Sequence, residues 1–155
     1  MIGPLHERIQ ELRALYPDDG SAIMPALQLA QAENGGWLSE QTFRQVAEAL
    51  EVTPARCLSI ASFYDMFRLE PVGETLIEVC TNLSCAVCGA QEVVEAFERE
   101  LGVEAGGVTE DGAFGLRAVE CLGGCGWATV VAIDNRHTLN VKAEQVPALV
   151  EELRA

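Results

Sequence analysis

The sequence predicts an α+β protein, with a helical bundle over residues 1–72 and a domain with a mixed four-stranded sheet over residues 73–155. Apolar residues recur at steps of three and four up to about residue 70, which is typical of amphipathic helices. A connector that contains proline and glycine, "RLEPVGE" at 68–74, then interrupts the pattern. Beyond it, short β-rich runs and helical segments follow in the order β-α-β-β-β-α.

Four helices are expected in the first part of the chain. A helical spacing of apolar residues runs from Leu5 until Pro17 stops it. Ser21 and Ser39 are typical N-cap residues, and we expect them to begin the second and third helices. Thr53 precedes a proline, and a cap followed by proline at the first helical position predicts the start of the fourth.

In residues 73–155 the helical spacing of apolar residues gives way to short β-rich runs that alternate with helical segments. The predicted elements are a strand at 75–80, a helix at 89–101, a strand at 113–121, a hairpin of 129–134 and 137–141 that turns at Asn135-Arg136, and a closing helix at 144–155. The first two strands should be parallel, because a helix that crosses between them returns the chain to the same end of the sheet.

Two groups of cysteines should meet at one edge of this sheet. Cys80 and Cys121 each end one of the two parallel strands. The carboxyl ends of parallel strands form the edge at which open α/β sheets bind their ligands. We therefore expect the loops Cys80–Cys88 and Cys121–Cys125 to open side by side.

Composition and charge argue against several classes of protein. The chain has a net charge of −14 with ten basic residues, so it offers no basic patch for nucleic acid. No apolar run approaches the roughly 18 residues that a membrane-spanning helix needs, and we expect no membrane insertion. Residues 1–17 lack the features of a signal peptide, which predicts a cytoplasmic protein whose thiols stay reduced.

Three possible uses of the cysteines fit the spacing poorly. Zinc usually takes four ligands from tight C-x2-C knuckles, whereas the gaps here are four and three residues with one cysteine to spare. A Rieske centre needs two histidines, and His6 and His137 are not near the cysteines in the sequence. Cys85 and Cys88 form a C-x-x-C motif typical of dithiol oxidoreductases, but three clustered cysteines would then have no role. Cys57 is expected to be a small buried residue of the fourth helix.

A [2Fe–2S] cluster on four thiolates explains more of the pattern. One version follows the plant-type spacing and takes Cys80, Cys85, Cys88 and one later cysteine. The other takes a pair from each loop: Cys80, Cys85, Cys121 and Cys125. Converging loops favour the second version, and the glycines of "LGGCG" would let backbone N–H groups approach the cluster.

Nearly the whole chain resembles the thioredoxin-like [2Fe–2S] subunit of respiratory complex I and of related NAD-linked hydrogenases and formate dehydrogenases. The resemblance is carried by "AIMPALQLAQAENGGWLSEQTFRQVAEALEVTPA", "SFYDMFRLEPVGE", "VCTNLSC", "GVTEDGAF" and "VECLGGCGWATVV". It implies a thioredoxin-like domain over residues 73–155 and one cluster with the ligands Cys80, Cys85, Cys121 and Cys125. Two positions depart from the family: Cys88 is an extra cysteine, and Thr129 stands where the family commonly has proline.

The resemblance also implies an electron-transfer role. The partner would be a flavoprotein subunit that oxidises NADH with FMN, within the NADH:quinone oxidoreductase of complex I. The equivalent subunit of a soluble NAD-linked hydrogenase or formate dehydrogenase is the alternative, and a dithiol oxidoreductase is a further one. We expect no independent active site, because no catalytic base, nucleophile or nucleotide-binding loop is found in the sequence. The implied location is a peripheral arm at the cytoplasmic face of the inner membrane.

Two further expectations concern the surroundings of the cluster. Glu78 and Glu120 each lie near a ligand cysteine and should lower the reduction potential, because they oppose added negative charge. Residues 1–70 contain no favoured ligand, so the bundle is expected to dock a partner through exposed aromatic residues: Phe63, Tyr64 or Phe67. The alternative is that these aromatic residues seal the bundle against the sheet.

Overall fold

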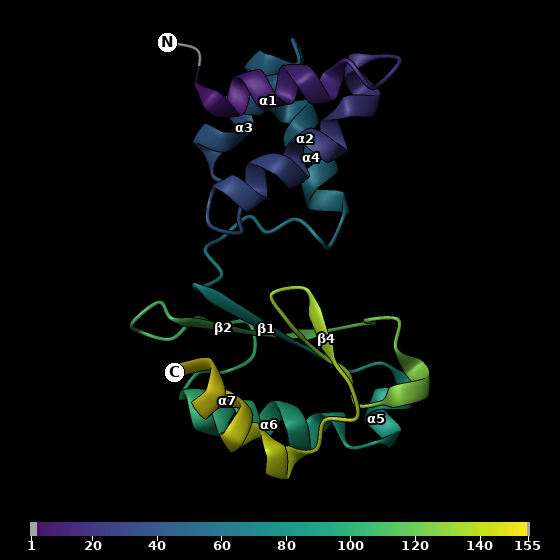
Figure 1. The fold of residues 1–155 in the computed structure, drawn as a ribbon, viewed down its shortest axis with the longest axis vertical. Helices are drawn as coiled ribbons and strands as arrows, with labels where there is room; N and C mark the ends of the chain where they lie inside the picture. Colours follow the sequence, from purple (N-terminus) through teal and green to yellow (C-terminus); the bar gives the residue numbers. More distant parts are fainter. Residues whose placement is uncertain (1–2, 155) are drawn as a thin grey trace. The chain divides into compact units, whose positions relative to one another are not determined.

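The computed structural model describes residues 3–154 and divides the chain into two compact units, Met1–Pro71 and Val72–Ala155. Each unit has its own hydrophobic core. The second unit contains both helices and a mixed sheet, which confirms the predicted α+β class (Figure 1). None of the helices in the described part of the chain is long and apolar enough to span a membrane.

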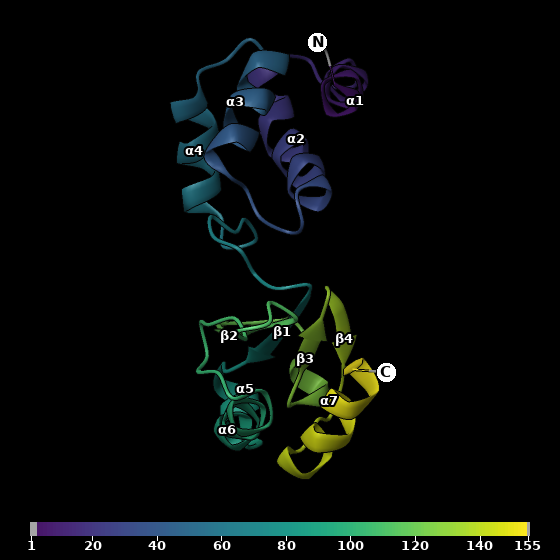
Figure 2. The same cartoon turned by 90° about the vertical axis from the view of Figure 1, so that its left-hand side faces the viewer.

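The first unit is a bundle of helices (Figure 2). Within the described residues the helices are α1 (Pro4–Arg13), α2 (Asp19–Glu33), α3 (Glu40–Ala49) and α4 (Pro54–Phe63). The predicted caps hold for two of them, since Ser39 accepts the N–H of Thr42 at 3.1 Å and Thr53 accepts that of Arg56 at 3.3 Å. The second helix begins earlier than predicted, because Asp18 is its cap and Ser21 donates to Asp18.

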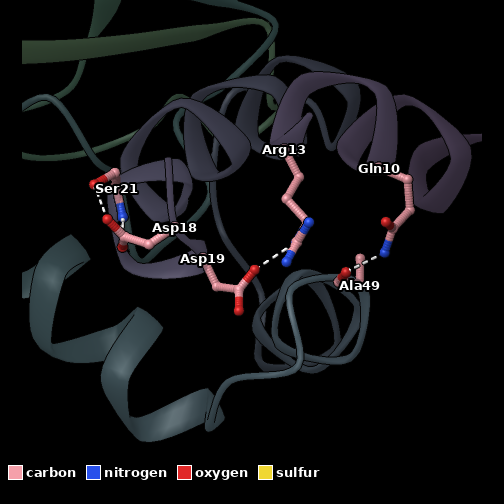
Figure 3. A network of polar contacts seen from close by, with 6 residues as sticks. All are labelled: Gln10, Arg13, Asp18, Asp19, Ser21 and Ala49. Atoms are coloured by element: carbon pink, nitrogen blue, oxygen red, sulfur yellow. Dashed lines mark hydrogen bonds and ion pairs between the residues drawn. The ribbon is translucent and has the colours of Figure 1, made fainter. Parts of the chain in front are cut away.

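Apolar side chains from all four helices form the core of this unit. Ile9, Ile23, Leu27, Val46 and Leu50 are completely buried in it. Polar contacts join the helix ends around this core. Figure 3 shows Gln10 of α1 donating to the carbonyl oxygen of Ala49, and Arg13 paired with Asp19 at the start of α2.

A buried glutamine fixes the segment that follows α4. The amide of Gln31 donates to the Met66 carbonyl oxygen at 3.1 Å and accepts the Arg68 N–H at 2.8 Å. Phe67 is consequently drawn into the core of the bundle and is 6% exposed. The expectation that Phe67 is exposed is therefore wrong, whereas Phe63 is 80% exposed.

The second unit is a four-stranded sheet in the order β2-β1-β3-β4. The strands are β1 (Thr75–Cys80), β2 (Phe114–Val119), β3 (Val131–Ile133) and β4 (Arg136–Thr138). β1 and β2 are parallel, as the crossover helix predicts, and the other neighbouring pairs are antiparallel. The helices α6 (Ala90–Leu101) and α7 (Val146–Arg154) cover one face of the sheet (Figures 1 and 2).

The strands differ from the predicted ones at their ends. β2 ends at Val119, so Cys121 lies two residues beyond the strand. The hairpin turns at Asp134 and Asn135, which have φ values of 47° and 65°, and so one residue earlier than predicted. Apart from glycine, Asp and Asn are the residues that adopt this left-handed conformation most readily. This preference explains why the turn lies at Asp134 and Asn135 and not at Asn135 and Arg136.

Candidate metal centre

The first cysteine loop follows β1 and contains a short helix that the sequence did not predict. Cys80 is the last residue of β1, and its N–H donates to the Val130 carbonyl oxygen of the neighbouring chain segment at 3.0 Å. Asn82 then caps α5 (Leu83–Val87), which places Cys85 in the middle of this helix. Cys80 and Cys85 are 3% and 2% exposed and form the inner pair of the site.

The second cysteine loop connects β2 to β3 and is rich in glycine. Cys121 and Cys125 are both exposed, and Cys125 begins the 3-10 helix η1 (Cys125–Trp127). The N–H of Gly123 donates to the sulfur of Cys121 at 3.4 Å. A Cβ atom at Gly124 would lie 2.8 Å from a methyl group of Val130, so a larger residue there would push the loop outward. The glycine therefore lets the outer pair of cysteines approach the inner pair.

Contacts of Cys80 link both loops. Burial acts to raise the pKa of Cys80, but the backbone N–H groups of Asn82 and Leu122 and the thiols of Cys85 and Cys121 outweigh it. The resulting pKa lies below that of an ordinary cysteine. Hydrogen bonds that stabilise a thiolate also favour its use as a metal ligand, since metals bind the deprotonated form.

Contacts of Cys85 extend the group to the fourth cysteine. Burial raises the pKa of Cys85, and the neighbouring Cys80 and Cys125 raise it further. The backbone N–H of Val130 acts in the opposite direction, but the pKa remains above that of an ordinary cysteine. Negative charge on several adjacent sulfurs is unfavourable in a protein without a cation. Cys80 thus interacts with Cys85 and Cys121, and Cys85 with Cys80 and Cys125, so these four free thiols are a donor set suited to a positively charged group.

The chemistry of this donor set fits a [2Fe–2S] cluster. Soft thiolate sulfurs are the usual ligands of iron–sulfur clusters, and apolar residues wall the inner pair: Ala90, Leu122, Ala128 and Val130. Within residues 3–154, no three or more cysteine, histidine, aspartate or glutamate side chains converge closely enough to hold a single metal ion. A [2Fe–2S] cluster does not require such a group, because two irons share the four thiolates.

Other candidate residues lie outside this group of four. Cys88 ends α5 with an exposed thiol, and Cys57 is completely buried in the first unit. Burial raises the pKa of Cys57, against a smaller lowering by Arg56, which fits the inert core residue that the sequence predicts. His6 belongs to α1 of the other unit, and His137 is exposed on β4.

The two glutamates near the cysteines have different surroundings. Glu78 is 8% exposed and pairs with Arg117, its partner across the parallel strands, at 3.3 Å. Its charge is therefore partly compensated, which the sequence did not indicate. Glu120 is exposed, and its backbone carbonyl oxygen accepts a hydrogen bond from the Cys80 thiol at 3.8 Å.

Thr129, which departs from the family's usual proline, has surroundings that the sequence did not predict. It is completely buried, and the peptide bond that precedes it is cis. Its carbonyl oxygen accepts the N–H of Val141 at 2.9 Å, whereas its hydroxyl oxygen has no hydrogen-bond partner among the described residues.

Comparison with known proteins identifies relatives along almost the entire chain. An NADH-quinone oxidoreductase subunit of Rhizobium meliloti (strain 1021) is 40% identical over 151 residues, which are 97% of this chain and 89% of that protein. An NADH-quinone oxidoreductase subunit of Rickettsia bellii (strain RML369-C) is 40% identical over 141 residues, which are 90% of this chain and 84% of that protein.

A solved structure shares the fold. The NAD+-reducing [NiFe]-hydrogenase in its air-oxidized state matches with a TM-score of 0.73 at 20% sequence identity. The match covers 83% of this chain but spans only 22% of the length of that hydrogenase chain. The sequence profile of the thioredoxin-like [2Fe-2S] ferredoxins matches residues 9–154. The chain belongs to the thioredoxin-like [2Fe-2S] ferredoxin family.

Proposed function

We propose that the chain is an electron-transfer subunit with one [2Fe–2S] cluster, which exchanges single electrons with the FMN of an NADH-oxidising partner subunit. The observation that carries this proposal is the proximity of free thiols from two loops, since Cys80 interacts with Cys121 and Cys85 with Cys125. The names of the relatives support NADH:quinone oxidoreductase as the parent complex.

The chain's own residues would hold and tune the cluster. When bound, a [2Fe–2S] cluster supplies a site that takes up and releases one electron. Cys80 and Cys85 would anchor it from inside the fold, and Cys121 and Cys125 would hold its outer side. Backbone N–H groups that donate to these sulfurs stabilise negative charge on them, which favours the reduced form.

The surface around the cysteine loops supports a partner that docks there. Residues 79–91 and 121–133 contain no Asp, Glu, Lys or Arg, although the chain as a whole is 22% charged. Leu83 and Val87 on α5 are 76% and 81% exposed, and Trp127 on the contacting helix η1 is 58% exposed. Exposed apolar groups on an uncharged surface are typical of protein interfaces. An interface there would bring the cluster close to the cofactor of the partner.

The same site would serve in a second parent complex. The fold shared with an NAD+-reducing [NiFe]-hydrogenase supports the equivalent subunit of an NAD-linked hydrogenase or formate dehydrogenase as the alternative. In both cases the chain would have no active site of its own. In the first case we place it in a peripheral arm at the cytoplasmic face of the inner membrane.

The proposal predicts a cluster that NADH reduces only through a flavoprotein. Anaerobically purified protein should be red-brown and contain about two irons and two sulfides per chain. NADH alone should leave it oxidised, and NADH with the co-purified flavin subunit should produce the EPR signal of the reduced cluster. Colourless, iron-free protein would contradict the proposal and favour the dithiol oxidoreductase. The other subunits that co-purify distinguish the two parent complexes.

The glutamates near the site give a prediction for the reduction potential. Glu78 and Cys80 lie two residues apart on β1 and therefore point to the same face of the sheet. We expect Glu78→Gln to raise the midpoint potential by an amount on the order of tens of millivolts, because it removes a buried negative charge. Arg117→Gln should lower the midpoint, and the exposed Glu120 should matter less because solvent screens its charge.

The measurement is an EPR-monitored redox titration. Glu95→Gln is the matched control, since Glu95 is exposed on α6 and its replacement removes the same charge from the chain. An equal shift in Glu95→Gln would show that net charge, not position, determines the effect. An unchanged midpoint in Glu78→Gln would contradict a role for this carboxylate.

A further inference from the structure

The hydroxyl group of Thr129 has no partner within the fold. The side chain is completely buried, and Oγ1 forms no hydrogen bond to any described residue. A buried hydroxyl without a partner is costly, so native proteins almost always satisfy it. The sequence around it is otherwise apolar, from Trp127 to Ile133. A buried hydroxyl in this setting therefore points to an acceptor that the described residues do not provide.

The residues on both sides of Thr129 line the cysteine site. Ala128 packs against the apolar group that contains Cys80 and Cys85, and Val130 belongs to that group. The backbone N–H of Val130 acts to lower the pKa of the Cys85 thiol, so it lies near that sulfur. Thr129 thus lies between two residues that pack against the inner pair of cysteines.

We propose that the Thr129 hydroxyl donates a hydrogen bond to a sulfur of the bound [2Fe–2S] cluster or of its cysteine ligands, and so raises the reduction potential. This inference rests on the proposed function, because it needs the cluster as acceptor. Sulfide and thiolate sulfurs become more negative on reduction and accept hydrogen bonds more strongly. The hydroxyl therefore stabilises the reduced state more than the oxidised state.

The test replaces the hydroxyl by a methyl group of nearly the same size. Thr129→Val should retain the cluster and lower the midpoint potential, with about a tenfold change in the reduction equilibrium, which is about 59 mV for a one-electron couple. Thr129→Ser retains the donor and should remain near the wild-type midpoint. In pulsed EPR of the reduced protein, Thr129→Val should lack one exchangeable proton coupling that the wild type and Thr129→Ser show.

Thr81→Val is the matched control. Thr81 follows Cys80 directly, but its hydroxyl already donates to the Val119 carbonyl oxygen at 3.1 Å. Loss of this satisfied hydroxyl should lower the Tm and leave the midpoint potential unchanged. A shift in both Val variants would indicate a general effect of polarity and would overturn the inference.

Protein without the cluster gives an independent measurement. In the apo protein the Thr129 hydroxyl is unsatisfied, so Thr129→Val should raise the Tm of the apo form, even if this variant fails to retain iron. A lower or unchanged apo Tm together with iron loss would overturn the inference, as would a wild-type midpoint in iron-loaded Thr129→Val. Neither of these results would contradict the proposed function. The proposed function fails if the wild-type protein binds no iron.

Discussion

Serine at Cys80, Cys85, Cys121 or Cys125 is expected to abolish or strongly alter the cluster. Each replacement removes one of four thiolates, and a serine hydroxyl is a harder, less acidic ligand that suits iron–sulfur clusters poorly. We expect iron content to fall roughly tenfold or more at the inner pair, since loss even of outer-shell partners costs about 10–100-fold in metal affinity. The measurements are iron per chain, the visible spectrum and the EPR signal.

Replacement of an inner cysteine should damage the cluster more than replacement of an outer one. Cys80 and Cys85 are buried among apolar groups, where no solvent can replace a lost ligand. Cys121 and Cys125 are exposed, so water or serine can occupy the open position, and a shifted spectrum is expected at these two sites.

Two cysteines of the same chain serve as controls. Cys88→Ser changes an exposed thiol directly after α5, and Cys57→Ser changes a buried thiol of the first unit. Both should retain the cluster, although Cys57→Ser places a polar group in the bundle core and should lower stability. Loss of the cluster in Cys88→Ser, with retention in Cys121→Ser, would instead support the plant-type ligand set.

The convergence of the two cysteine loops was predictable because it depends on chain order and strand direction. A strand, a helix and a second strand lead to parallel pairing, and this pairing aligns Cys80 with Val119 at the carboxyl edge. The helix α5 was not predictable in the same way. It has five residues, too few for a periodic pattern, and it depends on the Asn82 cap.

The features that tune the site depend on contacts distant in sequence. Glu78 reads as an exposed charge near a ligand, and only its alignment with Arg117 across two strands shows a buried ion pair. The hydroxyl of Thr129 is similar, since the apolar residues around it indicate burial but not that the hydroxyl lacks a hydrogen-bond partner among the described residues. Phe67 is buried because Gln31, which precedes it by 36 positions, holds the chain on both sides of it.

Residues 72–155 expressed alone are expected to retain the cluster and to bind the flavin subunit at least about tenfold more weakly than the whole chain, a loss of about 1.4 kcal/mol. The second unit contains all four proposed ligands and has a hydrophobic core of its own. The first unit contains neither a proposed ligand nor a strand among its described residues. It does expose apolar groups that a partner could cover, above all Phe63 at 80% and Met66 at 49%.

A point variant in the whole chain separates docking from folding. Phe63→Ser removes an exposed ring that contacts Tyr64 edge-on at 5.0 Å, so it should weaken binding to the flavin subunit and change the Tm little. Leu15→Ser is the matched control, because Leu15 is 81% exposed but lies in the turn after α1. Iron content and partner affinity are measured together, by spectroscopy and by calorimetric titration. If residues 72–155 alone hold no iron, the helices of the first unit are needed for the fold of the second. If Phe63→Ser, Leu15→Ser and the wild type bind the flavin subunit equally well, Phe63 is not part of the docking surface.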